Sequence, residues 1–387
     1  MDKSRLGGGD PPRYPFVLMF RFVHTADWQL GKPFGGFRPE TVENLKRARL
    51  DAIGRIAKVA RDHDAPHVVV AGDVWDTDLP SDRTVRQPLD AMGQARDVTW
   101  WLLPGNHDPA SRGGLWDRLR AGGLPANVRC LCSAEPHEAA PGVYFLPAPL
   151  VSKNPGHDPT AAMDAMTTPE GALRIGVGHG GVSGFGDESK AVIGRDRPER
   201  AGLAYLALGD WHGHGRVTDR VWYAGTPEPD SFPSNEPGYV LLVQAGAGRA
   251  PSVTPVPTWT YHWSREALDL TKGRDPVGLF EARFADGPPR ADRLVRLKVT
   301  GATGLHERTA LAAHLDRQHE DSFAHLRWDM DGLGAAMDDE ALDALDREGS
   351  LRACADALLG RERAEGASER ERLVARRALE LMASFAG

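Results

Sequence analysis

Five short apolar runs in this chain each end in polar side chains that can bind a metal ion. The runs have strand length and are rich in β-branched residues, as in residues 66–71, PHVVVA. One Asp after a strand is usually a turn residue or a helix cap, but five such segments are not explained by turn formation. The polar segments are 26–29 (ADWQ), 72–76 (GDVWD), 104–108 (PGNHD), 178–180 (GHG) and 209–214 (GDWHGH).

Helix and strand patterns alternate as far as about residue 257. A helix is expected over 41–63, a buried strand over 66–71, a second helix over 82–95 and a strand over 98–103. Further strands are expected at 142–147, 173–179, 203–209, 221–225 and 238–243. This alternation predicts a layered α/β domain, in which the polar segments form loops at the ends of strands.

The residue types in these segments indicate which ions they would hold. A mixture of Asp, Asn and His suits a hard or borderline divalent ion such as Mn²⁺, with Fe or Zn as alternatives. One carboxylate can bridge two ions ~3.5–4 Å apart, which is the arrangement used for phosphoryl displacement. The glycines let the backbone turn sharply beside the ions. These glycines are Gly72, Gly105, Gly178 and Gly209.

Composition restricts the function and the compartment. The formal net charge of −7, from 47 basic and 54 acidic residues, does not support a chain-wide electrostatic grip on nucleic acid, although a local basic groove stays open. Cys130, Cys132 and Cys354 fit neither a disulfide framework nor a zinc cluster, and they predict a reducing, cytoplasmic location. No apolar run approaches the ~20 residues of a membrane span.

Beyond about residue 257 the pattern changes. An alternating strand near 295–299, a helix over 305–319 and a strand over 323–330 predict a small β-α-β unit, and the chain from 338 onward is helical with mixed charges. A capping box of Ser368 and Glu371 opens the last helix. We therefore expect four regions: a disordered N-terminal extension at 1–18, a catalytic domain at 19–265, a small α/β domain at 266–335 and a helical region at 336–387.

The order of the polar segments resembles that of the calcineurin-like metallophosphoesterases, with D-x-H, GDxxD, GNHD, GH and GHxH in sequence. The sequence around them is similar to the bacterial SbcD-like branch, the nuclease subunits of double-strand-break repair complexes. The similar stretches are HTADWQLGKPF, VVVAGDVWDT, LLPGNHD and YLALGDWH. This resemblance covers about residues 19–265. It implies an α/β fold, a four-layer β-sandwich flanked by helices, followed by a small α/β capping domain and C-terminal helices that reach an SMC-like ATPase.

The resemblance also implies a role for each residue that matches a family motif. Asp27, Asp73 and His212 would hold a first metal ion. Asp73, Asn106 and His179 would hold a second, so that Asp73 bridges the two. The cofactor implied is a pair of divalent ions, with Mn²⁺ favoured and Mg²⁺ or Fe as alternatives.

Two further residues would carry the catalytic chemistry. His107 would protonate the leaving oxygen or stabilise the charge that develops on phosphorus. Asp76 would orient a catalytic group. The activity implied is hydrolysis of DNA phosphodiester bonds, by an exonuclease or endonuclease of DNA repair.

Two positions depart from the family pattern. Gln29 stands where the family has the His of D-x-H, and Asp210 stands where it has the first His of G-H-x-H. Glutamine offers a carbonyl oxygen, which is a weaker ligand than imidazole, and Asp210 offers a charged oxygen in place of a nitrogen. We interpret both as metal ligands of an active centre shifted toward harder ions such as Mn²⁺ or Mg²⁺, since Asp73, Asn106 and His107 are kept.

Two other functions stay open on the sequence. The acidic net charge favours a phosphodiesterase or phosphatase for small molecules. Gln29 and Asp210 favour a scaffold subunit of low activity that binds DNA and the ATPase. The helices from residue 338 could dock the ATPase or pack on the body of the protein, and a homodimer is implied only by the resemblance.

Overall fold

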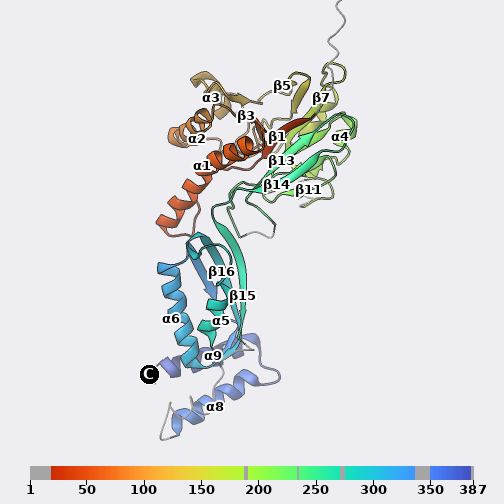
Figure 1. Cartoon of the computed structure of the whole chain (residues 1–387). Coiled ribbons are helices and arrows are strands. Elements are labelled where there is room, and N and C mark those ends of the chain that lie inside the picture. Colours follow the sequence, from red (N-terminus) through yellow and green to blue (C-terminus); the bar gives the residue numbers. More distant parts are fainter. Residues whose placement is uncertain (1–18, 187–190, 233–234, 271–274, 336–348, 385–387) are drawn as a thin grey trace, which may run out of the picture. The chain divides into compact units, whose positions relative to one another are not determined.

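The structure, a computed structural model, describes residues 19–186, 191–232, 235–270, 275–335 and 349–384 (Figure 1). The expected N-terminal extension, 1–18, lies outside these residues. The chain divides into two compact units, Met1–Tyr261 and His262–Gly387. The domain boundary expected at 265/266 therefore falls inside a strand, β15 (His262–Asp269).

The first unit contains two six-stranded sheets. In the first sheet β1 to β4 are parallel neighbours, and β13 and β14 continue it in the antiparallel sense. Its order is β14 (Ser252–Pro257), β13 (Tyr239–Ala245), β1 (Phe20–Thr25), β2 (His67–Val70), β3 (Thr99–Leu102) and β4 (Val128–Cys130). Pro255 and Pro257 are tolerated in β14 because an edge strand has backbone N–H groups that need no partner.

The second sheet has a similar plan, with four parallel strands at its centre and an antiparallel strand at each edge. Its order is β11 (Gly215–Arg216), β12 (Val221–Tyr223), β10 (Tyr205–Gly209), β7 (Leu173–His179), β6 (Val143–Pro147) and β5 (His137–Ala140). A separate short pair consists of β8 (Gly181–Val182) and β9 (Ala191–Ile193).

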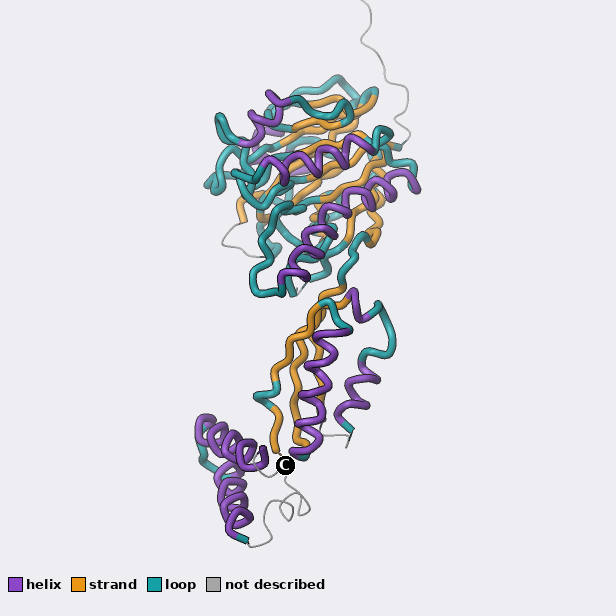
Figure 2. Tube along the Cα trace, turned by 90° about the vertical axis from the view of Figure 1, so that its left-hand side faces the viewer, coloured by secondary structure: helices purple, strands orange, loops and turns teal. Residues whose placement is uncertain are grey.

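The two sheets pack face to face, and helices cover their outer faces (Figure 2). The continuous apolar run of β2 follows from this, since Val68 and Val70 pack under helices while Val69 packs against the second sheet. The helices are α1 (Pro39–Asp62), α2 (Asp82–Gln94) and α3 (Leu115–Gly122) on the first sheet, and η1 (Pro159–Asp164) and α4 (Arg197–Arg200) on the second. The predicted four-layer β-sandwich is confirmed.

The second unit is built on a smaller, parallel sheet with helices on one face. Val295, Leu297 and Val299 of β16 pack toward α6, whereas Arg296 and Lys298 are exposed on the opposite face. The strands and helices are β15, β16 (Arg293–Thr303), β17 (His325–Asp329), β18 (Leu333–Ala335), α5 (Pro276–Arg283), η4 (Arg290–Asp292) and α6 (Leu305–Asp321). The predicted strand, helix and strand are present as β16, α6 and β17.

Two C-terminal helices, α8 (Ser350–Arg363) and α9 (Glu369–Ser384), pack on each other through Ala355, Leu359 and Leu379. The predicted capping box is present: the backbone N–H of Ser368 donates to the Glu371 carboxylate, and the backbone N–H of Glu371 donates to Ser368 Oγ. Residues 336–348 lie outside the described part of the chain. None of the described helices is long and apolar enough to cross a bilayer.

Candidate metal centre

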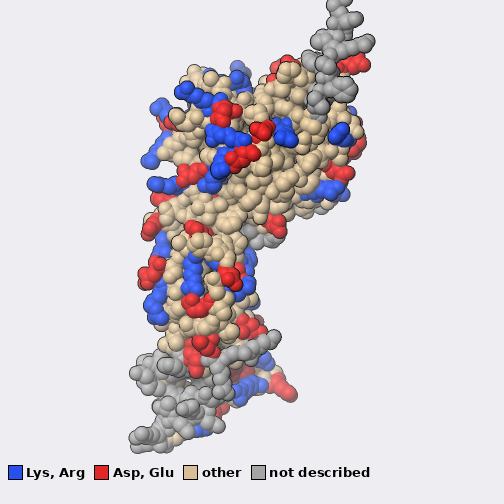
Figure 3. Space-filling model, viewed as in Figure 1, with Lys and Arg blue, Asp and Glu red and all other residues tan. Residues whose placement is uncertain are grey.

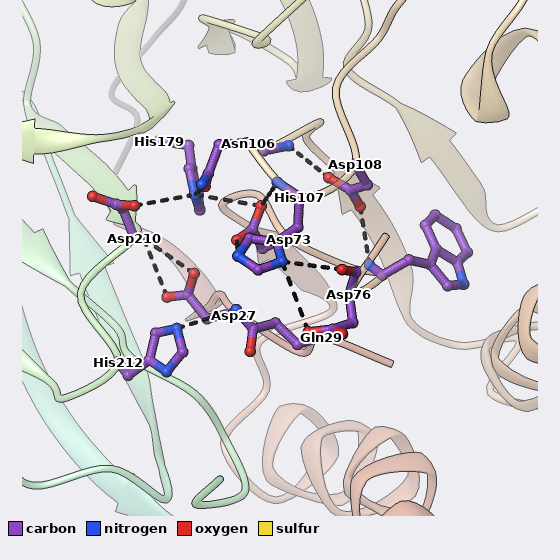
Figure 4. Close-up of polar contacts among 12 residues, drawn as sticks. Asp27, Gln29, Asp73, Asp76, Asn106, His107, Asp108, His179, Asp210 and His212 are labelled. Carbon is purple, nitrogen blue, oxygen red and sulfur yellow. Dashed lines mark hydrogen bonds and ion pairs between the residues drawn. The ribbon is translucent and has the colours of Figure 1, made fainter. Parts of the chain in front are cut away.

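The five polar segments meet where central strands of the two sheets end. Three segments follow β1, β2 and β3 of the first sheet, and two come from the ends of β7 and β10 of the second. Because the carboxyl ends of parallel strands lie at one edge of a sheet, their loops converge. The residues brought together are Asp27, Gln29, Asp73, Asp76, Asn106, His107, His179, Asp210 and His212 (Figure 4).

Backbone hydrogen bonds extend the pairing of β1 and β2 into the two loops that follow them. The N–H of Asp27 donates to the carbonyl of Gly72 (3.1 Å), and the N–H of Gln29 donates to that of Asp73 (2.9 Å). The first two polar segments therefore lie on a rigid support rather than on mobile loops.

Backbone strain is concentrated at the centre. Of the six described non-glycine residues with a positive φ, four belong to it: Asp27 (53°), Gln29 (40°), Asp73 (55°) and Asp210 (101°). Each such conformation costs about 1–3 kcal/mol and persists where the surroundings enforce it, commonly at functional sites. The strain supports a functional role for these four positions.

Two glycines allow the loops to approach the side chains of the centre closely. Gly72 has a φ of 93°, and a Cβ atom there would collide with the ring of His179. A Cβ atom at Gly105 would collide with the carboxylate of Asp73. The loops after β2 and β3 therefore depend on residues without side chains.

His179 anchors one candidate metal position. Its Nδ1 donates to the carbonyl of Ala71 (2.8 Å), and its Nε2 faces Asn106 Oδ1 at 2.8 Å, Asp73 Oδ1 at 3.5 Å and Asp210 Oδ1 at 3.9 Å. An imidazole that donates from Nδ1 carries a lone pair on Nε2 unless it is charged. Three oxygens around that atom are therefore favourable only when a proton or a cation lies among them. This donor set fits a hard or borderline divalent ion.

The charges of the buried groups agree with this fit. Ligand atoms of Asp27, Asp73 and His179 all lie within 4.8 Å of one another, and all three residues are buried. Burial raises the pKa of Asp27 to about 6. Burial opposes the charged form of His179 as well, but Asp73 and Asp27 outweigh it and raise the pKa of His179 well above its ordinary value. Buried carboxylates of this kind need a cation, and a divalent ion would supply the charge.

The other candidate position lies beside Asp27 and His212. The Nδ1 of His212 faces the buried carboxylate of Asp230, 3.1 Å from Oδ2, so its Nε2 is left to face the centre. That Nε2 lies 3.2 Å from the side-chain nitrogen of Gln29. The Gln29 oxygen accepts a hydrogen bond from Lys32 Nζ at 3.0 Å. The oxygen expected to be a metal ligand is thus directed at Lys32.

His107 lies at the accessible side of the centre, with 38% of its side chain exposed. Its backbone N–H donates to Asp73 Oδ1 (2.9 Å), and its Nδ1 donates to the backbone carbonyl of Asp76 (3.0 Å). Because Nδ1 is engaged, Nε2 is the ring atom that can exchange a proton with a substrate. The Asp76 carboxylate lies 3.7 Å from Nδ1, and burial raises the pKa of Asp76.

Sequence reasoning assigned no role to Asp108, although it ends the GNHD motif. This fully buried carboxylate accepts from the backbone N–H of Gly105 (2.8 Å) and from that of Trp75 (3.0 Å). It joins the loops after β2 and β3, and burial raises its pKa. Its position directly after Asn106 and His107 could have indicated from the sequence that Asp108 belongs to the site.

A second group missed from the sequence centres on Asp230. Its carboxylate contacts Lys32 Nζ (2.5 Å), Arg49 (3.4 Å) and His212. Burial would raise the pKa of Asp230, but His212 and Arg49 outweigh it and lower the pKa below its ordinary value. Asp230 follows β12 in the loop GTPEPDS, and its signal in the sequence is no stronger than that of any acidic loop residue.

A layered sandwich with Asp, Asn and His gathered at the strand ends defines a metal-dependent phosphoesterase. The profile of the calcineurin-like phosphoesterases matches residues 20–246, and the chain belongs to this family. The expected family membership is confirmed.

Two relatives indicate the branch of the family. The chain is 30% identical over 289 residues to the D subunit of the SbcCD nuclease of Rhodobacter capsulatus, and the match covers 61% of this chain and 69% of the relative. It is 32% identical over 94 residues to the DNA double-strand break repair protein Mre11 of Archaeoglobus fulgidus, covering 24% of this chain and 20% of that relative. Both support the predicted SbcD-like branch.

Proposed function

We propose that this chain is a metal-dependent DNA nuclease of the SbcD type, a hydrolase that cleaves phosphodiester bonds in DNA repair. The observation that carries the proposal is the cluster of Asp27, Asp73 and His179, whose ligand atoms lie within 4.8 Å of one another beside the accessible His107. The names of the two relatives, one a nuclease subunit and the other a repair protein, support DNA as the substrate.

The proposed centre would hold two divalent ions, with Asp73 as a ligand of both. Asp27 and His212 would complete one position, which Gln29 could join only after its oxygen leaves Lys32, and the remaining ligands would complete the other. Divalent ions supply Lewis acidity and lower the pKa of a bound water, and we propose Mn²⁺, with Mg²⁺ or Fe as alternatives. The ligands of the other position are Asn106, His179 and Asp210.

His107 is the proposed proton donor to the leaving oxygen. Its Nδ1 is held by the Asp76 carbonyl at 3.0 Å, so Nε2 is the atom that delivers the proton. Asp76 is the proposed positioning residue, because both its carbonyl and its carboxylate lie beside that ring.

We also propose that α8 and α9 dock an SMC-like ATPase subunit. The R. capsulatus relative is named as one subunit of a nuclease, and this helix pair exposes large apolar side chains. These are Leu351, Leu373, Val374 and Leu381. A homodimer is proposed on the family resemblance alone, and the three free cysteines support a reducing, cytoplasmic location.

One observation favours a second candidate, a phosphodiesterase for small molecules. Basic and acidic side chains are interspersed over the face shown in Figure 3, in keeping with a net charge of −7. Turnover of a chromogenic phosphodiester, of single-stranded DNA and of duplex DNA separates the candidates. A nuclease cleaves DNA at least as efficiently as the chromogenic ester, whereas a small-molecule enzyme cleaves only the ester.

The scaffold alternative requires a different measurement, namely the metal content of the purified protein. A nuclease of the proposed type binds added Mn²⁺ at the centre, and loss of Asp73 abolishes that binding. A scaffold would bind duplex DNA while neither holding Mn²⁺ nor cleaving either substrate.

A further inference from the structure

The two candidate metal positions differ in what faces their ligand atoms. At His179, Nε2 faces the oxygens of Asn106 (2.8 Å) and Asp73 (3.5 Å), so the space among them favours a cation. At His212, Nε2 faces the side-chain nitrogen of Gln29 at 3.2 Å. That N–H already occupies the lone pair with which His212 would bind an ion.

Lys32 holds Gln29 in this orientation. Its Nζ lies 3.0 Å from the Gln29 oxygen and 2.5 Å from Asp230 Oδ2. If the amide turned over to offer its oxygen to the centre, its NH₂ group would face the Lys32 ammonium, and two donors would oppose each other. Gln29 can therefore ligate an ion only after its bond to Lys32 breaks.

Asp230 in turn holds Lys32. Only 6% of Asp230 is exposed, and its carboxylate also contacts Arg49 at 3.4 Å and His212 Nδ1 at 3.1 Å. A lysine tied to a buried carboxylate is not free to swing away into solvent. The position of the Lys32 charge is therefore fixed by its contact with Asp230.

The charges beside the two positions act in the same direction. Asp210 brings a carboxylate to within 3.9 Å of His179 Nε2 and so attracts a cation to that position. Lys32 brings an ammonium group to Gln29, next to His212, and so lessens the attraction that the carboxylates of Asp27 and Asp230 exert on a cation there. The two residues that depart from the family pattern, Gln29 and Asp210, thus weaken one position and strengthen the other.

We propose that Lys32 is a positioning residue that makes the two metal positions unequal. The position of Asp73, Asn106, His179 and Asp210 binds its ion tightly. The position of Asp27, Asp73 and His212 binds its ion weakly and releases it readily. This inference rests on the proposed metal-dependent function, and it makes the activity respond to the concentration of free metal.

The test is a calorimetric titration of the metal-free, full-length protein with Mn²⁺, together with elemental analysis after desalting. The wild type should show two events whose Kd values differ by roughly tenfold or more, and it should retain about one ion per chain after desalting. Lys32→Met, which removes the charge and keeps the length, should tighten only the weaker event by roughly tenfold. Combining Lys32→Met with Gln29→His should let the protein retain about two ions.

Two variants separate this role from a structural one. Lys32→Arg keeps the charge and should keep the two affinities apart. Lys58→Met removes an exposed lysine that pairs with Asp62, and it should change neither event. If Lys32→Met does not fold, Gln29→His alone carries the test, because its imidazole should tighten the weaker event.

Equal Kd values for the two ions in the wild type would overturn the inference, as would a gap that Lys32→Met leaves unchanged. If the wild type bound two equal ions and still cleaved DNA, only the inference would fail. If it bound no Mn²⁺, the proposed function would fail with it.

Discussion

At the scale of single residues, His107 combines exposure with a fixed ring. The bond from Nδ1 to the Asp76 carbonyl holds the imidazole while Nε2 stays accessible. His107 is also not a member of the cluster of candidate metal ligands formed by Asp27, Asp73 and His179. Its chemistry can therefore be removed separately from metal binding.

His107→Asn should lower kcat for DNA cleavage by roughly 10²–10⁴-fold, because asparagine cannot protonate the leaving oxygen. Mn²⁺ content should stay at the wild-type level. Single-turnover rates and elemental analysis on the same preparation check both halves. An unchanged kcat would remove His107 from the mechanism, and a lost metal would make it a ligand.

His24 is a buried imidazole whose protonation at low pH should destabilise the fold. Its ring lies 3.0 Å from Tyr205 Oη and 3.1 Å from the Leu208 carbonyl, and burial lowers its pKa to about 3. An unfolded chain has an ordinary histidine pKa of about 6.5, so between these two values the unfolded state binds the extra proton. The stability that neutral His24 contributes is therefore fully present above pH ~6.5 and is lost as the pH drops toward 3.

This group should cost about 1.4 kcal/mol of unfolding free energy for each pH unit below ~6.5. His24→Gln cannot titrate, so its stability should fall less steeply with acidification, whatever its stability at pH 7. Urea unfolding of both proteins at one pH above ~6.5 and at one pH between ~6.5 and 3 measures how steeply the stability of each falls. Parallel slopes would contradict a neutral, buried His24.

At the scale of elements, the loop after β3 is limited by space rather than by backbone conformation. Gly105 has no positive φ, yet a Cβ atom there would overlap the Asp73 carboxylate and its backbone nitrogen. Gly105→Ala should therefore displace Asp73 and abolish Mn²⁺ binding, which calorimetry measures. Gly54→Ala in α1 is the matched control, since a Cβ atom there meets nothing within 4 Å, and it should bind Mn²⁺ normally. Normal binding by both variants would show that the loop can relax.

Elements buried on both faces were the most predictable from sequence. The run PHVVVA predicts a strand that is present as β2, and the expected strand at 173–179 is β7. By contrast, β14 contains two prolines and β15 reads HWSREALD, so neither shows the apolar run of a buried strand. Both were missed because pairing with a neighbour, rather than local pattern, makes them strands.

The candidate site shows the same division. Asp27, Asp73, Asn106 and His179 were predictable because each follows a recognisable strand. Lys32 and Asp230 were not, because their contact joins loops 198 positions apart and depends on tertiary packing. The orientation of the Gln29 amide depends on that same contact, so no local pattern contains it.

At the scale of the whole molecule, the chemistry and the proposed docking surface lie in different units. The candidate metal centre belongs entirely to Met1–Tyr261, whereas α8 and α9 belong to His262–Gly387. Changes to the exposed apolar residues of the helix pair should therefore act on association alone. This separation makes the partner testable without disturbing the catalytic residues.

Leu373→Glu combined with Val374→Glu should abolish association with the SMC-like ATPase, because it puts charge on an apolar contact surface. Cleavage of DNA by the isolated chain should not change. Val151→Glu, an equally exposed apolar position in the first unit, is the control and should leave association intact. Co-purification of the two proteins measures binding, and retained binding by the double variant would place the contact elsewhere.

We propose above that the carboxylates and histidines at the strand ends form a metal centre that hydrolyses DNA. The most direct test is cleavage of an end-labelled duplex with Mn²⁺, with Mg²⁺ or with a chelator, for the wild type beside Asp73→Ala. We expect cleavage that depends on added metal and is reduced to background in the variant, because Asp73 is the proposed ligand of both positions. Equal cleavage by Asp73→Ala and wild type, or undiminished cleavage in the chelator, would contradict the claim.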